Sequence, residues 1–393
     1  MRVLSFSFIG VCLLFSYSTH SQGWKRECLG YYQLELPDNL DVALYPINGF
    51  INPVYQPEGN GFFITSRYAT NGITFGEKYD KSTQDAVQSQ FSTFYYGNYE
   101  LDISTQNEEP VDFSAYKERI IDKIKFGIDV AKKKEALQLK ILGTPVMDKS
   151  EFDRKHGYEI KDYPHAFVEY DYRGYTIYIN GGKRLYHFWG PNAKDTGEKS
   201  QTAEKQWQQS EPEVLSLLSR FRPRNLYEVP SSQGFCLPYG FITNDSGHES
   251  RNMGVTYRLK NHPDVTIFFQ DLGPSSGPGE RRPDPNMSAK DYVTYFWNVR
   301  YGHSFRDIKL YGKGFSYPDM DNRKAVAASA KFTRYDKQID YGYVAFVKGE
   351  TPEEPDLLFY VIRDSRQARD NPPMEQGEIQ KMAEYIVSTI KRR

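Results

Sequence analysis

Cysteine is the residue type in this sequence with the most distinctive chemistry, and the chain has three, Cys12, Cys28 and Cys236. An isolated cysteine can be a nucleophile, a metal ligand, half of a disulfide or a small buried apolar residue. Cys236 lies in the stretch QGFCLPYGFI, far from the other two. No histidine-bearing motif of a cysteine enzyme accompanies it, and the seven histidines are scattered singly. A catalytic thiol and a metal site are therefore both disfavoured.

The amino-terminal segment determines which of these cysteines matter. Arg2 precedes an apolar run over residues 3–15, and the small residues Thr19 and Ser21 follow it. This order predicts a cleaved secretory signal peptide over residues 1–21, and hence an exported, soluble protein. A transmembrane anchor is the alternative, but the run is about 13 residues long, whereas a spanning helix needs roughly 20.

Cleavage would remove Cys12 and leave two cysteines. An exported chain meets oxidising conditions, in which paired thiols become disulfides. Two cysteines allow only one pairing, so we predict a disulfide between Cys28 and Cys236. Two separate buried thiols are the alternative interpretation.

No other group of residues predicts catalysis. The sequence lacks the motifs G-x-S-x-G, H-E-x-x-H, the Walker loop and the dinucleotide glycine pattern, and no spacing selects one carboxylate pair. We therefore predict no catalytic residue, no metal site and no cofactor. Arg281 and Arg282, in the Gly/Pro-rich loop 273–286, could bind an acidic partner; a solvated loop tip is the alternative.

The composition argues against two classes of partner. Its 50 Lys and Arg balance 51 Asp and Glu, which argues against nucleic acid or an anionic membrane as the main partner. The 31 Tyr and 25 Phe suit half-buried strands and also protein interfaces.

Hydrophobic periodicity predicts helices and strands in both halves of the chain. Ser210 and Glu213 have the spacing of a capping box, with Pro212 in the first turn of a helix that ends near Pro223. The other helices are expected at about 82–96, 112–137, 288–300 and 372–390. Strands are expected at 28–37, 41–47, 61–69, 165–172, 175–181, 184–190, 236–242, 252–260, 264–272, 308–317, 325–335, 341–349 and 356–364.

Two of the expected hairpin turns contain glycine. Arg173-Gly174 and Gly181-Gly182 join neighbouring strands and suit turns that require positive φ.

The order of these elements predicts an α+β protein with two lobes, 22–224 and 225–393. Each half has strands, a helix, a strand meander and a closing amphipathic helix, so we expect antiparallel-rich sheets with packed helices. Each half also has one cysteine in its opening strand. The predicted disulfide would join these two strands and limit the movement of the lobes.

Three stretches together resemble one known family. They are CLGYYQLELP at 28–37, RPRNLYEVPSSQGFCLPYGFI at 222–242 and LKNHPDVTIFFQ at 259–270. In this order they resemble the Tli4-type immunity proteins of type VI secretion, over nearly the whole mature chain.

The resemblance implies a function and a location. Such proteins lie in the periplasm and bind a cognate phospholipase effector, and their two lobes form a claw around its lid. The partner implied is thus a lipase, with no nucleic acid and no stable membrane insertion. The alternatives are an exported two-lobed protein that binds a small solute or envelope component, and an uncharacterised exported hydrolase.

Overall fold

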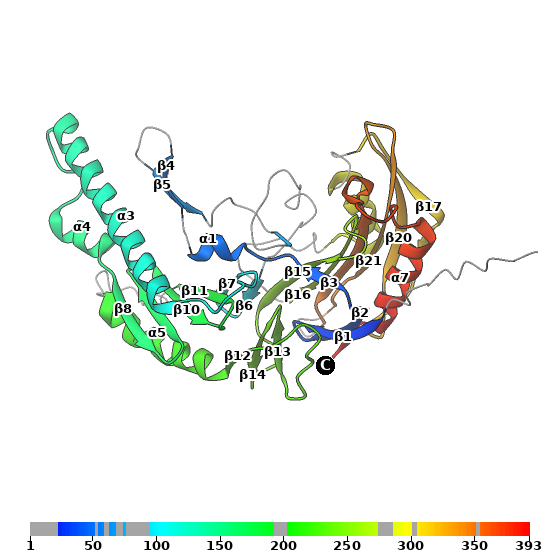
Figure 1. Ribbon diagram of the computed structural model, residues 1–393, viewed down its shortest axis with the longest axis horizontal. Helices are drawn as coiled ribbons and strands as arrows, with labels where there is room; N and C mark the ends of the chain where they lie inside the picture. Colours follow the sequence, from blue (N-terminus) through cyan, green and yellow to red (C-terminus); the bar gives the residue numbers. More distant parts are fainter. Residues whose placement is uncertain are drawn as a thin grey trace, which may run out of the picture.

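A long antiparallel sheet extends through both halves of the molecule (Figure 1). The computed structural model describes residues 23–51, 54–58, 63–67, 74–75, 94–191, 203–273, 286–300, 305–350 and 354–393. The expected signal peptide and the loop residues Arg281 and Arg282 lie outside these ranges.

The sheet's main path has twelve strands. In spatial order they are β17 (Asp307–Ser316), β20 (Val326–Thr333), β21 (Ile339–Val347), β22 (Asp356–Arg363), β16 (Val265–Leu272), β15 (Arg251–Leu259), β6 (Phe94–Tyr96), β7 (Tyr99–Ile103), β11 (Leu185–Pro191), β10 (Gly174–Asn180), β9 (Ala166–Tyr170) and β8 (Glu159–Tyr163). The thirteenth strand, β3 (Leu40–Val42), pairs with β15 off this path.

Helices cover both faces of this sheet. They are α1 (Ile47–Ile51), α3 (Phe113–Leu142), α4 (Lys149–His156), α5 (Ala203–Arg220), α6 (Ala289–Tyr295) with the π-helix η2 (Phe296–Arg300), the 3-10 helix η4 (Ser365–Gln367) and α7 (Gln376–Thr389).

Four small sheets complete the described fold. They are β1 (Trp24–Leu29) and β2 (Tyr32–Pro37) with β23 (Lys391–Arg392); β12 (Phe221–Pro223) and β13 (Gly234–Leu237) with β14 (Gly240–Thr243); β18 (Asp319–Met320) with β19 (Arg323–Lys324); and β4 (Val54–Glu58) with β5 (Phe63–Arg67).

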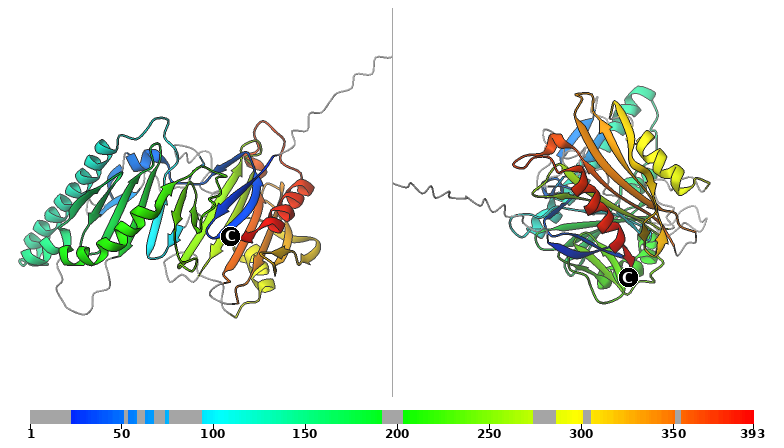
Figure 2. Two further views of the ribbon diagram at one scale, coloured as in Figure 1. Left: turned by 90° about the horizontal axis from the view of Figure 1, so that it is seen from below. Right: turned by 90° about the vertical axis from the view of Figure 1, so that its right-hand side faces the viewer.

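The molecule has the form of an arc with two arms (Figure 1). One arm contains α3, α4 and β8–β11, the other contains α7 and β17–β22, and β6, β15 and β16 connect them. Figure 2 shows the strands side by side along the length of the molecule, with β12–β14 near its middle. The predicted α+β class with antiparallel-rich sheets is confirmed.

Alternation along the strands explains how two helices pack on opposite faces of the first arm. Successive strand residues point to opposite faces, so Tyr170 and Phe167 face different sides. Tyr170 stacks on Trp207 of α5, with ring centroids 4.8 Å apart. Phe167 contacts Phe113 of α3, with centroids 5.3 Å apart. The same principle separates α7 from α6 and η2 in the second arm.

Several expected elements have a different form in the structure. The helix expected at 82–96 falls mostly outside the described residues, and its last three residues form the strand β6. The capping box is wrong, because α5 already begins at Ala203 and Ser210 lies inside it. The Ser210 hydroxyl donates to the Gln206 carbonyl, at 3.1 Å, instead of capping a helix end.

One of the two glycine turns also differs from its expectation. Gly182 has φ of +81°, as its turn requires, but Gly174 has no positive φ. The carboxylate of Asp171 closes that turn instead, accepting from the backbone N–H groups of Arg173 at 2.7 Å and Gly174 at 3.2 Å. An Asx turn of this kind reverses the chain without left-handed backbone.

The first strands of the chain pack against its second half. Tyr32 of β2 pairs with Arg392 of β23, and Leu40 of β3 pairs with Leu259 of β15. The main sheet also contains strands from both sides of residue 224. The division into lobes at 22–224 and 225–393 stays a prediction. In the part of the chain that the structure describes, no helix is long and apolar enough to span a membrane.

Candidate functional site

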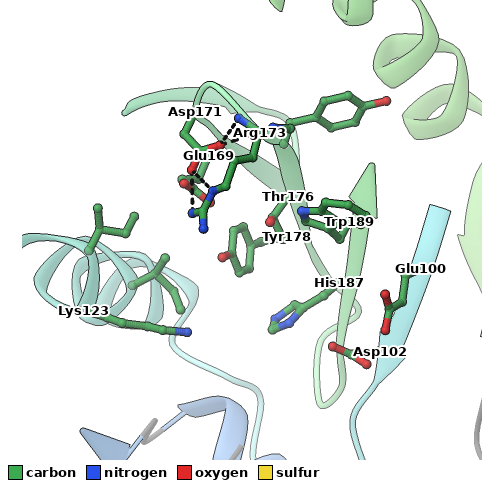
Figure 3. Close-up of a pocket in the computed structure, with 14 residues that line it drawn as sticks. Glu100, Asp102, Lys123, Glu169, Asp171, Arg173, Thr176, Tyr178, His187 and Trp189 are labelled. Carbon is green, nitrogen blue, oxygen red and sulfur yellow. Dashed lines mark hydrogen bonds and ion pairs between the residues drawn. The ribbon is translucent and has the colours of Figure 1, made fainter. Parts of the chain in front are cut away.

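A charged hollow of about 470 Å³ lies between α3 and the sheet of the first arm (Figure 3). Its walls combine carboxylates, two cations and aromatic rings. The lining residues are Glu100, Asp102, Ile120, Lys123, Ile124, Glu169, Asp171, Arg173, Gly174, Tyr175, Thr176, Tyr178, His187 and Trp189.

The strand register brings the polar side chains together. Thr176 of β10 lies opposite Glu169 on one side and Trp189 on the other, and Trp189 lies opposite Glu100. These four residues therefore form one row across the same face of the sheet. A second row on this face contains Phe167, Tyr178, His187 and Asp102.

Two neighbouring carboxylates in the hollow, Asp171 and Glu169, differ in their bonding. The Asp171 carboxylate accepts from the Arg173 guanidinium at 2.6 and 2.9 Å (Figure 3). The Glu169 carboxylate and the Lys123 ammonium form neither a hydrogen bond nor an ion pair within the described part of the chain. Burial raises the pKa of Glu169 to about 7, and the neighbouring Asp171 adds to this effect. Burial also lowers the pKa of Lys123.

His187 stabilises the floor of the hollow. It is buried, and its Nε2 lies 2.5 Å from the hydroxyl of Tyr116 on α3. Phe50 of α1 also contacts it, with ring centroids 4.3 Å apart. Burial, together with the charge of Lys123, holds the pKa of His187 well below its usual range. The ring is therefore neutral near pH 7, and its Nε2 shares a hydrogen bond with the Tyr116 hydroxyl.

The hollow suits a polar or cationic group of a protein partner. Its four carboxylates outnumber the two cations, Lys123 and Arg173. Trp189, at 44% exposed, supplies an aromatic surface beside them, and rings in such positions are frequent anchors in protein interfaces. Among the residues that the structure describes, no group of three or more His, Cys, Asp and Glu side chains is placed to hold a metal ion.

A second cluster of buried bonds joins the first strand to the middle of the chain. Cys28 and Cys236 form a disulfide with Cα atoms 5.7 Å apart. Gly30 and Cys236 exchange backbone hydrogen bonds of 2.8 and 3.0 Å beside it.

A buried ion pair lies next to this disulfide. The Arg224 guanidinium binds the Glu27 carboxylate at 2.5 Å, and both side chains are almost fully buried. The same guanidinium donates to the carbonyls of Cys28 at 2.8 Å and Leu237 at 2.9 Å. Each added hydrogen bond offsets part of the cost of burying this charge.

The candidate site was not visible in the sequence. Arg281 and Arg282, the expected partner-binding residues, lie outside the described part. Glu169 and Asp171 alternate with Val168, Tyr170 and Tyr172 in the segment HAFVEYDY. That alternation was the one available signal of a polar face on this strand, but it says nothing of the cation on α3 opposite it.

The geometry can be compared with known proteins. Residues 228–279 match the family model described as Tle cognate immunity protein 4 C-terminal domain. This segment contains β13–β16 and Cys236. No curated protein sequence matches the chain.

Two solved structures share the fold. One is the immunity protein TplEi of the T6SS from Pseudomonas aeruginosa in complex with "L" peptide, with TM-score 0.54, 13% identity and coverage of 94% of this chain and 98% of that chain. The other is the Tle4–Tli4 complex, with TM-score 0.54, 14% identity and coverage of 94% and 98%. The family match and the shared fold confirm the resemblance to Tli4-type immunity proteins.

Proposed function

We propose that this chain is a periplasmic immunity protein that binds and inhibits a phospholipase effector of type VI secretion. The match of residues 228–279 to the Tle cognate immunity protein 4 C-terminal domain is the observation that carries this proposal. The fold shared with a chain of the Tle4–Tli4 complex supports it. On this proposal the protein is an inhibitor, and the catalytic groups belong to its partner.

The arc gives this inhibitor a means of gripping its partner. Two arms joined by one sheet can contact a convex protein from two sides (Figure 1). A phospholipase that opens a lid at a membrane surface exchanges between closed and open states. An inhibitor that binds the closed state suppresses opening through its difference in affinity for the two states. Protection requires tight binding. A Kd near 1 nM corresponds to a binding free energy of about −12 kcal/mol.

A titration tests the proposal. The mature protein, purified without reductant, is added to the phospholipase encoded beside its gene, and release of fatty acid from vesicles is measured. We expect activity to fall linearly to zero at a fixed molar ratio, with an unrelated lipase as the control. Full activity at excess protein, with no complex on a sizing column, contradicts the proposed function.

A second substrate separates lid gripping from direct blockage of the active site. If the lid is held closed, hydrolysis of vesicles is lost while slow hydrolysis of a dissolved short-chain ester persists. Equal loss of both activities would contradict the lid mechanism and leave inhibition itself established.

The location can be tested independently. We expect the chain in the periplasmic fraction to begin at Gln22, as the expected signal peptide 1–21 implies. Amino-terminal sequencing of the exported protein measures this directly. An intact amino terminus in a membrane fraction would contradict it.

A further inference from the structure

Helix α3 extends far beyond the sheet that supports its beginning. It has 30 residues and is therefore about 45 Å long. Asp112 caps its start by accepting from the Ala115 N–H at 3.0 Å, and Gly143, with φ of +72°, ends it. Its buried residues are Tyr116 and Ile120, both in the first turns. The rest of the helix projects along the end of the arm with α4 beside it (Figure 1).

The projecting part has an apolar stripe. Phe126, Val130, Leu137 and Ile141 follow one another at steps of four and seven residues, which places them on one line along the helix, and Val130 is half-buried. Phe126 is 40% exposed, Leu137 38% and Ile141 70%. Exposed apolar side chains aligned on one side of a helix are a feature of interaction surfaces.

The stripe is on the side of α3 that faces the middle of the molecule. Arg119 lies seven residues before Phe126, on the same line, and its guanidinium donates to the carbonyl of Ile51 at 2.9 Å. Ile51 ends α1, whose Phe50 packs on His187 of β11. Phe113 and Tyr116 of α3 contact β9 and β10, and Tyr116 also reaches His187 of β11, while α1 lies inward of α3. Figure 1 shows α1 in this place.

The surroundings of the stripe are basic. Residues 125–142 contain five lysines and two carboxylates, in a chain whose formal net charge is −1. Lys133 and Lys140 lie seven residues apart along the edge of the stripe beside Leu137 and Ile141, and Asp129 precedes them by one turn on that edge. An apolar strip with a basic edge is complementary to an apolar surface with an acidic edge.

We propose that the inward stripe Phe126, Val130, Leu137 and Ile141 binds an amphipathic, acid-edged helical segment of the phospholipase. This inference rests on the proposed function and specifies which part of the first arm makes the contact. A helix packed along the stripe buries apolar side chains at its centre and pairs carboxylates with Lys133 and Lys140 at its edge. A flat membrane fits this face less well, because the face is turned toward the inner side of the arc.

The same helix supplies a matched control. Leu139 is 45% exposed, as open as Leu137, but is about 200° further round the helix. Leu137→Asp and Leu139→Asp therefore make the same chemical change at similar exposure on opposite sides. The affinity of each variant for the effector phospholipase is measured by isothermal titration calorimetry, and its inhibition of vesicle hydrolysis is measured beside it. Circular dichroism checks that each variant is folded.

We expect Leu137→Asp to weaken binding at least about tenfold and Leu139→Asp to change it less than about twofold. Replacing Lys133 and Lys140 by Gln should lower the association rate and its dependence on salt. Wild-type affinity in Leu137→Asp overturns the stripe while leaving the proposed function intact. Equal losses of affinity in the two aspartate variants also overturn it, because the effect would then not depend on which side of α3 carries the substitution.

Failure of the proposed function gives a different result. In that case the wild-type protein neither binds nor inhibits the phospholipase, and the stripe proposal fails with it. Sedimentation with anionic vesicles, or a sizing column, would then show whether Leu137→Asp releases a membrane or a second copy of the chain, and either result would replace the lipase as occupant.

Discussion

At the scale of single residues, the charged hollow contains a carboxyl group whose pH response can be stated. The folded-state pKa of Glu169 is raised to about 7 by burial, above its ordinary value of 4.5. The folded protein therefore binds more protons than the unfolded chain between these two values. The sign follows from linkage: the free energy of unfolding falls as pH rises through this interval, and the loss is complete above about pH 7.

Glu169→Gln should remove this dependence. At pH 8 we expect the variant to be more stable than the wild type, by up to about 3 kcal/mol, since one pKa unit corresponds to about 1.4 kcal/mol. At pH 4 the two proteins should differ little. Urea unfolding at both pH values measures this, and a variant that is less stable than the wild type at pH 8 contradicts the assignment.

At the scale of elements, the sequence predicted the segments whose pattern is local. The spacing of Tyr116, Ile120 and Ile124 predicted α3, and the spacing of Ile379, Met382 and Ile386 predicted α7. The hollow could not be predicted, because it depends on the pairing of β7, β9, β10 and β11 and on the placement of α3 above them. The exposed stripe was also missed, since the same apolar periodicity is read as a buried face.

The proline inside α5 lowers the stability of this helix. Pro212 lies in the interior of this helix, where it lacks the N–H that would donate to the Gln208 carbonyl. Because residue 212 is exposed, Pro212→Ala can restore this bond without a change in core packing, and should stabilise the protein by about 1 to 3 kcal/mol. Thermal unfolding checks this. A lower Tm would contradict this account of Pro212.

At the scale of the whole molecule, the disulfide between Cys28 and Cys236 connects segments separated by 208 residues. It lies beside the buried Arg224–Glu27 pair, near the point where both arms meet. In the chain-entropy account, a cross-link of this span raises the free energy of unfolding by about 3 to 5 kcal/mol.

Loss of the bond should therefore be measurable. We expect Cys28→Ser to lower the urea midpoint under non-reducing conditions, and reductant to lower the wild-type midpoint similarly. The double variant Cys28→Ser, Cys236→Ser is the control and should not respond to reductant. An unchanged midpoint in Cys28→Ser would show that the bond adds nothing to stability.

The pairing of β2 with β23 also determines when this region of the protein can be completed. The hairpin β1–β2 is synthesised early, but Tyr32 and Gln33 find their strand partners only at Arg392 and Lys391. Contacts between such distant parts of a sequence form slowly, because a long loop must close first. The outer edge of β2 therefore stays unpaired until the last residues of the chain are available, whereas Cys28 needs only Cys236. Until then β2 presents an open strand edge, which can pair with a wrong strand.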